Sequence, residues 1–301
     1  MPMNEAAFLA YLRHLPLHAG ARGLRDDAAV LGDLVLTHDV LVEGVHYLPD
    51  DPAEDVAWKL VAVNLSDLAA KGAVPEGVLL GYPLAGDDAW DSSFLAGLDA
   101  ALAAFACPLI GGDTVKAPAG VPRTLSLTAL GRSTHAPARS GAQAGDLLYV
   151  TGTIGDGGAG LAVAMAGEGP ATLLARYRRP TPRLEEGQAL APGVHAMMDV
   201  SDGLLIDAAR MAEASGLAVT IDLAAVPLSA DYQAVRGGDR DARLAAATAG
   251  DDYELLFAAP QGPLPLAATC LGAFSEGEGL TLHDAGTPLA LPGRLGFEHG
   301  G

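Results

Sequence analysis

Short apolar runs of strand length alternate with segments of helical periodicity along this 301-residue chain. Such alternation is typical of proteins that pack helices on sheets, so the expected fold class is α/β with some α+β character. Strands are predicted at 34–40, 77–82, 107–111, 124–129, 146–150, 195–200, 217–222 and 253–258, and helices at 52–71, 89–106 and 203–215.

The helix after the first strand has the clearest end signals. Asp51 is the expected N-cap, Pro52 the first helical residue, and Glu54 completes a capping box. Gly72 follows as the C-terminal stop, and Lys71 stands in the last turn, where a cation favours the helix dipole. These signals define a long helix in the first half of the chain.

The segment 133–145, STHAPARSGAQAG, is small, polar and poor in apolar residues. This composition is typical of a connection between folded units. We therefore expect two α/β lobes of similar size, a first domain over 1–134 and a second over 135–301, which the chain length permits.

The charge balance excludes several classes of protein. Thirty-seven acidic residues against 18 Lys and Arg give a formal net charge of −19. Nucleic acids and anionic membranes are recognised largely by basic residues, so neither partner is expected. Half of the residues are hydrophobic and 18% are charged, which excludes a disordered acidic tail.

Cysteine usage and hydropathy indicate a cytoplasmic protein. Cys107 and Cys270 form no CxxC pair, so neither a structural zinc site nor a disulfide framework is expected. The start of the chain contains Glu5 and no long apolar region, unlike a signal peptide. No apolar run reaches the ~18 residues that a membrane span needs.

The positions of the aspartates carry the most functional information. Asp67 falls on the same helical face as Val56, Leu60 and Val63. A carboxylate on an apolar stripe costs free energy unless it is paired or binds a metal. The alternative is a helix that turns Asp67 toward an arginine or an open edge.

Further aspartates stand at the ends of predicted elements: Asp26, Asp27, Asp39, Asp113, Asp199 and Asp202. In α/β sheets, ligands bind beyond the carboxyl ends of the strands. Each acid alone is more often a cap or turn residue, and Asp202 beside Ser201 resembles a cap, but six together indicate one convergent site. Carboxylates without cysteine suit Mg²⁺, Mn²⁺ or Ca²⁺, and because no EF-hand spacing is present, Mg²⁺ that bridges phosphates is favoured.

A protein of this charge repels ATP and other phosphates, which would bind only through metal ions, arginines and backbone N–H groups. Arg139, in the sequence ARSGAQAG, can present a guanidinium and backbone donors, although alone it resembles a surface arginine. His46 follows the strand of Asp39 and could reach a substrate, although a lone histidine is more often structural.

A glycine-rich turn offers an alternative function. Gly155 to Gly160 matches GxGxxG between a strand and a helix, which is the dinucleotide-binding context and would indicate a NAD-binding oxidoreductase. No acid-ended strand follows about twenty residues later, however, and a glycine-rich helix start also serves packing. P-loop, GxSxG and HExxH motifs are absent from the sequence.

Taken in order, the motifs resemble those of the thiamine-monophosphate kinase family, in the superfamily of aminoimidazole ribonucleotide synthetase. The segments that carry the resemblance are RDDAAVL (25–31), THDVLVEGVHY (37–47), AVNLSDLAAKGAVPEG (62–77), LIGGDT (109–114), ARSGAQAGDLLYVTGTIGD (138–156), DVSDGLLID (199–207), AGDDYELLF (249–257) and GFEHG (296–300).

The resemblance implies a two-lobed aminoimidazole ribonucleotide synthetase-like fold. The first lobe would bind metal and nucleotide and form a barrel with a second copy in a homodimer, and the second α/β lobe would complete the active site. The implied reaction transfers the γ-phosphoryl group of ATP to thiamine monophosphate. Because a phosphate monoester is already ionised near neutral pH, such a site needs charge neutralisation and alignment rather than a strong base.

The resemblance also implies roles for particular residues. The implied ligands of several Mg²⁺ ions are Asp27, Thr37, His38, Asp39, Asp67, Asp113, Asp199 and Asp202, of which Asp67, Asp113 and Asp202 would be catalytic. The implied nucleotide contacts are Gly112, Asp113, Arg139 and Ser201, and the implied thiamine monophosphate contacts are His46, Asp251 and Phe297.

Three residues depart from the family pattern. Arg25 replaces a glycine before the paired aspartates, His38 replaces a serine or threonine, and Asp251 lies in AGDD where the family has a GGED-type stretch. Another ATP-dependent enzyme of the superfamily remains an alternative, although the absence of a cysteine before Cys107 disfavours selenophosphate synthetase. A non-catalytic binder with a decayed site is disfavoured by the intact set of acids.

Overall fold

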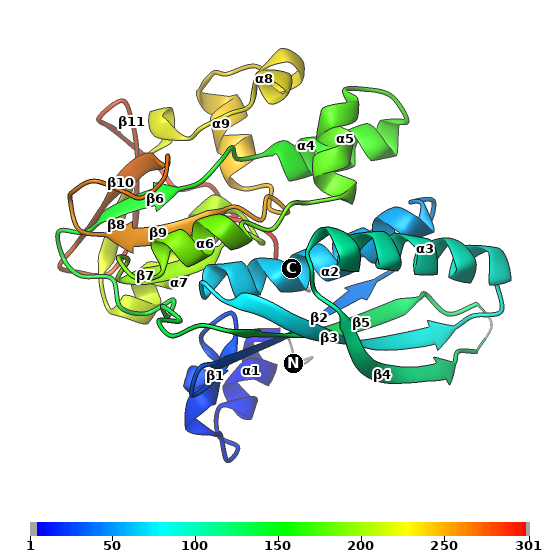
Figure 1. The fold of residues 1–301 in the computed structure, drawn as a ribbon. Helices are drawn as coiled ribbons and strands as arrows, with labels where there is room; N and C mark the ends of the chain where they lie inside the picture. Colours follow the sequence, from blue (N-terminus) through cyan, green and yellow to red (C-terminus); the bar gives the residue numbers. More distant parts are fainter. Residues whose placement is uncertain (1–4, 119, 299–301) are drawn as a thin grey trace.

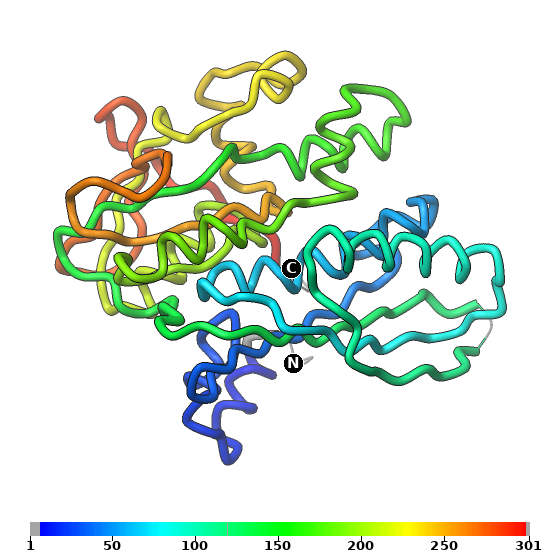
Figure 2. Tube along the Cα trace, in the orientation of Figure 1, coloured from blue at the N-terminus to red at the C-terminus, as the bar shows by residue number. Residues whose placement is uncertain are grey.

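The computed structural model describes residues 5–118 and 120–298, arranged as two lobes that are each built on one sheet (Figure 1). The chain passes from the first lobe to the second after residue 132, and its last described residues return to the junction between the lobes (Figure 2). Because the described residues end at 298, the GFEHG motif at 296–300 lies partly outside them.

The first sheet has the strand order β1-β2-β5-β3-β4, in which β3 and β4 are parallel and the other pairs antiparallel. Its strands are β1 (Ala29–Leu31), β2 (Leu34–Val42), β3 (Val74–Leu84), β4 (Leu109–Lys116) and β5 (Thr124–Arg132). The helices of this lobe are α1 (Glu5–Leu12), the 3₁₀ helix η1 (Ala19–Leu24), α2 (Ala53–Ala70) and α3 (Asp88–Ala104).

Helices α2 and α3 cover one face of this sheet, and the opposite face of β3, β4 and β5 has no helix over it in Figure 1. Alternation along β5 explains the arrangement, because Leu125, Leu127 and Ala129 are buried toward the helices while the residues between them are partly exposed. Among the described residues the sheet stays open, with β1 and β4 at its edges, so one chain does not close a barrel.

The second sheet has the order β12-β11-β8-β10-β6-β9-β7. Its strands are β6 (Leu147–Val150), β7 (Ala196–Asp199), β8 (Ala218–Asp222), β9 (Leu255–Ala259), β10 (Thr269–Ser275), β11 (Gly279–Asp284) and β12 (Thr287–Leu289). The helices are α4 (Asp156–Ala166), α5 (Ala171–Arg178), α6 (Leu184–Leu190), α7 (Leu204–Ser215), the 3₁₀ helix η2 (Leu223–Ala225), α8 (Ala230–Arg236) and α9 (Arg240–Ala247).

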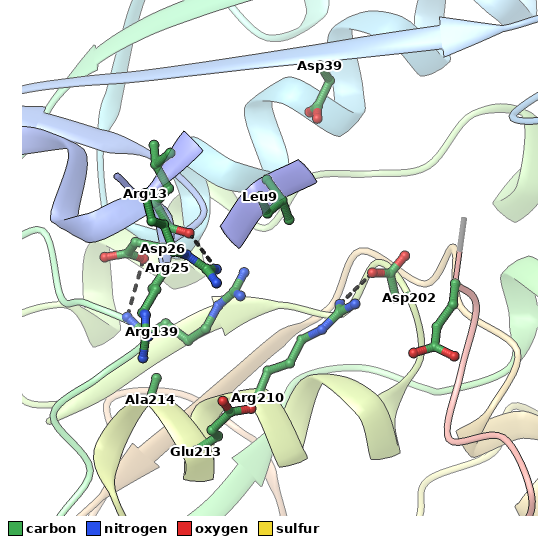
Figure 3. Close-up of a pocket in the computed structure, with 12 residues that line it drawn as sticks. Leu9, Arg13, Arg25, Asp26, Asp39, Arg139, Asp202, Arg210, Glu213 and Ala214 are labelled. Atoms are coloured by element: carbon green, nitrogen blue, oxygen red, sulfur yellow. Dashed lines mark hydrogen bonds and ion pairs between the residues drawn. The ribbon is translucent and has the colours of Figure 1, made fainter. Parts of the chain in front are cut away.

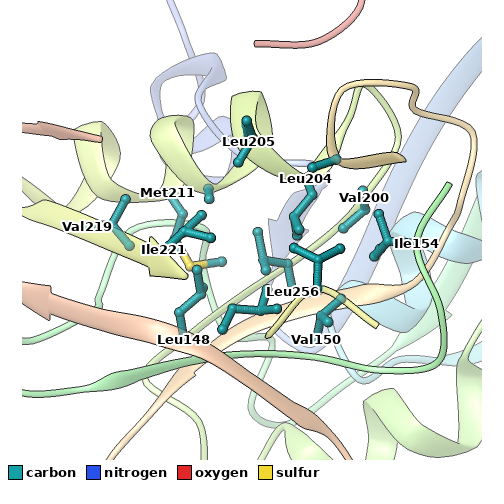
Figure 4. Packing of buried hydrophobic residues seen from close by; sticks show 14 of the residues in the cluster. Leu148, Val150, Ile154, Val200, Leu204, Leu205, Met211, Val219, Ile221 and Leu256 are labelled. Atoms are coloured by element: carbon teal, nitrogen blue, oxygen red, sulfur yellow. The ribbon is translucent and has the colours of Figure 1, made fainter. Parts of the chain in front are cut away.

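The core of the second lobe lies between this sheet and α7. Leu148, Ile221 and Leu256 of the strands meet Leu204 and Met211 of the helix, and all five are fully buried (Figure 4). Burying side chains of this size contributes roughly 1.5–3 kcal/mol each. The packed core therefore fixes the positions of the strand and helix ends at the lobe junction.

Helix α2 lies between the two lobes and is buried around most of its circumference. It packs against the first sheet and α3 on one side and against α6 and β7 on the other. Its polar residues Lys59, Asn64 and Ser66 are also buried, as is Lys71 directly after its last residue, so each needs a partner inside the protein.

The predicted strands and helices are found, with ends shifted by up to a few residues, but two details were wrong. The segment 107–111 was expected to be a buried strand, whereas β4 begins at Leu109 and is exposed along its length at the sheet edge. Asp51 is not an N-cap, because its carboxylate accepts hydrogen bonds from the Leu48 N–H at 2.8 Å and the Tyr177 hydroxyl at 2.8 Å.

Across the described residues, every helix is too short or too polar to cross a membrane.

Candidate functional site

Three aspartates from distant parts of the chain meet where the lobes join. Asp27 precedes β1, Asp67 lies on α2, and Asp199 ends β7, and one carboxylate oxygen of each lies within 4.8 Å of the others. Asp39 of β2 lies close enough to raise the pKa of Asp67. We call Asp27, Asp39, Asp67 and Asp199 the acidic group.

Burial and mutual repulsion raise the pKa of three of the four acids in the acidic group. Burial, followed by the charges of neighbouring acids, raises the pKa of Asp67 well above its ordinary value. Burial likewise raises the pKa of Asp199 to about 8 and that of Asp39 to about 6. Several carboxylates buried close together repel one another, and a bound cation would offset that repulsion. This group is therefore suited to bind a cation.

Asp27 differs because two basic side chains pair with it. Burial raises the pKa of Asp27, but Lys71 and Arg139 outweigh that effect and bring it to about 2. The Lys71 ammonium is fully buried and lies 2.7 Å from Asp27 Oδ2 and 2.5 Å from Asp26 Oδ1. Arg139 Nη2 lies 2.5 Å from Asp27 Oδ1. One side of the acidic group is thus neutralised by the chain itself.

Hydroxyl and amide groups orient the remaining acids. The Thr37 hydroxyl donates a hydrogen bond to Asp67 Oδ2, and the Ser66 hydroxyl donates one to Asp199 Oδ2 at 2.6 Å. Asn64 Oδ1 accepts a hydrogen bond from the backbone N–H of Asp39 at 3.1 Å. Helix α2 therefore supplies both an acid and the groups that hold its neighbours.

The chemistry of these donors fits a hard divalent cation. The candidate ligand atoms are carboxylate oxygens, which Mg²⁺ and Mn²⁺ prefer. Asp27 Oδ2 is buried and in ionic contact with Lys71, yet it accepts no well-directed hydrogen bond. The residues present therefore fit a Mg²⁺ site.

Asp202 is not the cap of α7, contrary to its appearance in the sequence. The buried carboxylate of Asp207 reaches back instead and accepts the backbone N–H groups of Ser201, Asp202 and Gly203 at 3.1–3.2 Å. The Asp202 carboxylate consequently faces the cleft, where it pairs with Arg210 (Figure 3).

Two of the cavities around the acidic group share a boundary. The larger, of about 770 Å³, is lined by four arginines and five acids: Arg13, Arg25, Arg139, Arg210, Asp26, Asp39, Asp202, Glu213 and Glu298 (Figure 3). The smaller, of about 330 Å³, brings together the predicted site residues His46, Asp67, Asp199, Ser201, Asp251 and Phe297. Asp39 and Asp202 line both cavities, so the acids form the boundary between them.

One chain brings His38 to the edge of the acidic group but leaves Asp113 away from it. His38 lines a further cavity, of about 380 Å³, together with Asp27, Asp39 and Asp67, and it opposes the effect of burial that raises the pKa of Asp39. Successive residues of a strand point to opposite faces, so His38 faces away from Asp39 and lies 2.8 Å from the Thr128 hydroxyl on the uncovered face of the sheet. Asp113 is exposed in β4 and pairs with Gly81, in a row that continues through Ser126 and also faces away from α2.

Gly112 lies beside Asp113 on the same edge strand. Its φ is +153°, and a Cβ there would collide with the backbone of Leu80. The close approach of β4 to β3 therefore requires glycine at this position.

The glycine-rich turn does not offer a dinucleotide site. Asp252 already fills the N-terminus of α4, where its carboxylate accepts the N–H of Gly155 at 2.8–2.9 Å and that of Gly157 at 3.2 Å. A Cβ on Gly157 would meet the Asp251 backbone, and one on Gly160 would meet the Leu173 carbonyl. These glycines serve packing, which removes the reason for the oxidoreductase alternative.

Sequence reasoning missed several residues that shape the site: Lys59, Lys71, Asp207, Arg210 and Asp252. The sequence contained a signal for the two lysines. Lys59 interrupts the apolar sequence of α2, and Lys71 follows the last residue of this helix. Asp207 lies in the first turn of α7, so an acid at the start of the helix was a local signal for its capping role. Nothing local marks Asp252 as a cap, since it lies in another segment of the chain.

Comparisons with known proteins agree with this geometry. The family described as "AIR synthase related protein, N-terminal domain" matches residues 25–133, and the corresponding C-terminal domain family matches residues 143–285. The chain is 40% identical to a thiamine-monophosphate kinase of Caulobacter vibrioides, over 99% of this chain and 92% of the relative, and 39% identical to one of Salmonella typhimurium, over 92% and 91%. A solved structure of AaThiL complexed with AMPPCP and TMP superposes with a TM-score of 0.85 at 29% identity, covering 99% of this chain and 97% of that one.

The raised pKa values of Asp39, Asp67 and Asp199 predict a pH-dependent stability of the metal-free protein. Between about pH 4 and 8 the folded state binds more protons than the unfolded state, so this stabilisation is complete at low pH and is lost as pH rises through the folded pKa values. In EDTA, we expect the free energy of unfolding to fall from pH 5 to pH 8, by up to about 1.4 kcal/mol per pH unit for each proton.

Thermal unfolding at several pH values, with and without Mg²⁺, measures this effect. Mg²⁺ should raise Tm most at pH 8, where the acids are deprotonated. Asp207 and Asp252, whose pKa values burial also raises, add a slope of the same sign, so the difference between wild type and Asp67→Asn isolates the acidic group. Identical pH profiles for the two proteins, with no Mg²⁺ effect, would contradict the assignment.

Proposed function

Because this chain belongs to the AIR synthase related family, and within it to the thiamine-monophosphate kinases, we propose that it transfers the γ-phosphoryl group of ATP to thiamine monophosphate. The products are thiamine diphosphate and ADP. One observation carries this function: the acidic group lies between a large arginine-lined cavity and a smaller cavity that holds the predicted acceptor contacts.

The reaction must bring two polyanions together in line. We place Mg²⁺ on Asp27, Asp67 and Asp199, with Asp39 beside them. When bound there, Mg²⁺ would neutralise and orient the phosphate oxygens. Thr37 and Ser66 hold the acids in place through their hydroxyls, so the side chains are oriented before the substrates arrive.

The larger cavity suits the nucleotide. Arg139 and Arg210 line it and carry permanent positive charge in a protein whose net charge is −19. Arg25, one of the three departures from the family pattern, lines the same cavity and can add a phosphate contact. Ser201 lies at the border with the smaller cavity, close to where the two substrates must meet.

The smaller cavity suits the organic part of the acceptor. Asp251 offers a side chain that is 35% exposed, and Phe297 offers a ring that is about half exposed. Thiamine monophosphate carries a cationic ring and an amino-substituted ring, and these groups match an acid and an aromatic side chain. Its phosphate would then point toward the acidic group, because Asp67 and Asp199 line the same cavity.

The uncovered face of the first sheet supports a homodimer as a further part of the proposal. Val40, Leu79 and Val115 are exposed on this face, which a monomer would leave in contact with water. In the proposed dimer, two such sheets form a shared barrel. Gly112 and Asp113 would then approach the acidic group of the partner, which accounts for their distance from the acidic group of their own chain.

The proposal keeps two further expectations from the sequence. A first domain over 1–134 would bind metal and nucleotide and form the dimer, and a second over 135–301 would complete the site. A cytoplasmic location accords with the use of ATP.

A coupled assay with thiamine monophosphate, ATP and Mg²⁺ tests the function directly. We expect thiamine diphosphate to form with Mg²⁺ and not with EDTA. Asp67→Asn should lower kcat by at least ~10²-fold while the protein stays folded, because it removes one charge from the cation site and little volume. Absence of product from the wild-type protein with Mg²⁺ would overturn the function, and full activity of Asp67→Asn would make Asp67 a structural acid.

Mixed dimers test whether Asp113 acts across the subunit interface. Asp67→Asn and Asp113→Asn should each be inactive alone, whereas a heterodimer of the two would contain one site with both aspartates. After subunit exchange at equal concentrations, we expect roughly a quarter of the wild-type activity to return, because half of a random mixture is heterodimer. No recovery in a mixture shown to contain heterodimers would place Asp113 in the site of its own chain or outside it.

A further inference from the structure

Lys59 lies on α2, two turns before Asp67, and the proposed chemistry assigns it no role. Its side chain is only 3% exposed, although lysine is among the residues least often buried. Burying an ammonium group costs free energy that only close partners offset. The partners of Lys59 therefore indicate why it is there.

Three segments from outside α2 contact the Lys59 ammonium. Nζ lies 2.7 Å from Asp251 Oδ2, in the loop before β9, and donates a hydrogen bond to the His46 carbonyl oxygen at 3.0 Å. It also lies 4.2 Å from the centre of the Tyr177 ring, at the end of α5. A single buried cation thus joins the two lobes through two residues that line the smaller cavity, His46 and Asp251.

Asp251 is held in one orientation from both sides. While Lys59 engages Oδ2, the Tyr253 hydroxyl donates to Oδ1 at 3.0 Å. The backbone of Asp251 has a left-handed φ of +60°, and its N–H donates to the Ser201 carbonyl at 2.8 Å. Gly157 packs against its carbonyl side with no room for a Cβ. An uncommon backbone conformation held by several contacts is typical of a residue placed for function.

The contacts of His46 also hold this residue in one orientation. Its ring nitrogen Nδ1 accepts the Val42 N–H at 3.0 Å, so in the neutral ring the proton is on Nε2, which becomes a donor. Lys59 fixes the main chain of the same residue through its carbonyl. The acceptor Asp251 and the donor His46 are thus held at a set separation on the wall of one cavity.

Lys59 also distinguishes Asp251 from the acids that receive cations. Asp39, Asp67 and Asp199 line the same cavity, and their pKa values are raised by burial and by neighbouring acids. Asp251 instead has an ammonium at ion-pair distance, which reduces its attraction for a divalent ion. Its carboxylate is left to accept hydrogen bonds from an organic ligand.

We propose that Lys59 is a positioning residue for the organic part of the phosphoryl acceptor: it sets Asp251 and His46 as a matched acceptor and donor on the wall of the smaller cavity. The inference rests on the proposed function, because it takes thiamine monophosphate as the ligand of that cavity. Lys59 acts through its two partners and touches neither ATP nor the reacting phosphates.

Steady-state kinetics of Lys59→Met test this role. Methionine keeps much of the side-chain volume but removes the charge and the hydrogen-bond donors. We expect KM for thiamine monophosphate to rise by about tenfold or more, while KM for ATP stays within about twofold and kcat falls less than about threefold. Lys59→Arg, which keeps a cation, should recover part of the loss. Arg236→Met, an exposed residue at the end of α8, is the matched control and should resemble the wild type.

A second variant covers the case in which Lys59→Met does not fold, because that change leaves Asp251 unpaired. Lys59→Met with Asp251→Asn removes both charges of the pair, so it should fold and still bind thiamine monophosphate weakly in calorimetry. Unchanged affinity for thiamine monophosphate in a folded variant, or an equal rise of KM for ATP, would overturn the inference. Absence of thiamine diphosphate formation by the wild type would instead overturn the proposed function, and the inference with it.

Discussion

The structure depends on bringing like charges together in a buried place. Asp27, Asp67 and Asp199 approach within 4.8 Å at the junction of the lobes, with Asp39 beside them. Taking unpaired carboxylates out of water costs several kcal/mol for each ion, and mutual repulsion adds to this cost. The protein offsets part of it with a fully buried lysine and a partly buried arginine at Asp27, and protons or cations must compensate the remaining acids. A site that is costly without cations is, for the same reason, one that binds them.

Helix α2 makes this arrangement possible. Because it is buried between the first sheet and the second lobe, its polar residues can face only other parts of the protein. Asp67 contributes a carboxylate in the last turn of the helix, between Lys59 and Lys71, which contribute positive charges. Lys71 fixes the acidic loop before β1, and Lys59 fixes the wall of the smaller cavity. The helix thus orders the two substrate regions around one acid.

The sequence predicted the part of this account that follows from local pattern. Apolar periodicity located the principal strands and helices, and the misplaced acid at Asp67 indicated the site. Alternation along β2 predicts that the side chains of His38 and Asp39 leave the strand on opposite sides, but it does not predict that both residues line one cavity with Asp27 and Asp67. The exposure of β4 could not be predicted, since a strand that one chain leaves open has the same apolar composition as a buried one. The capping role of Asp252 depends on a contact across 97 residues that no local spacing indicates, whereas that of Asp207 lies within the first turn of its own helix.

The central claim is that Asp27, Asp67 and Asp199 form a site for divalent cations at the meeting point of two phosphate-bearing substrates. Anomalous diffraction from crystals grown with Mn²⁺ and a non-hydrolysable ATP analogue tests it most directly, because Mn²⁺ replaces Mg²⁺ at oxygen ligands and its position is seen without assumptions about the ligands. The account predicts anomalous peaks within bonding distance of carboxylate oxygens of these three residues, between the nucleotide and the smaller cavity. Bound nucleotide with manganese elsewhere, or with no manganese, would contradict it.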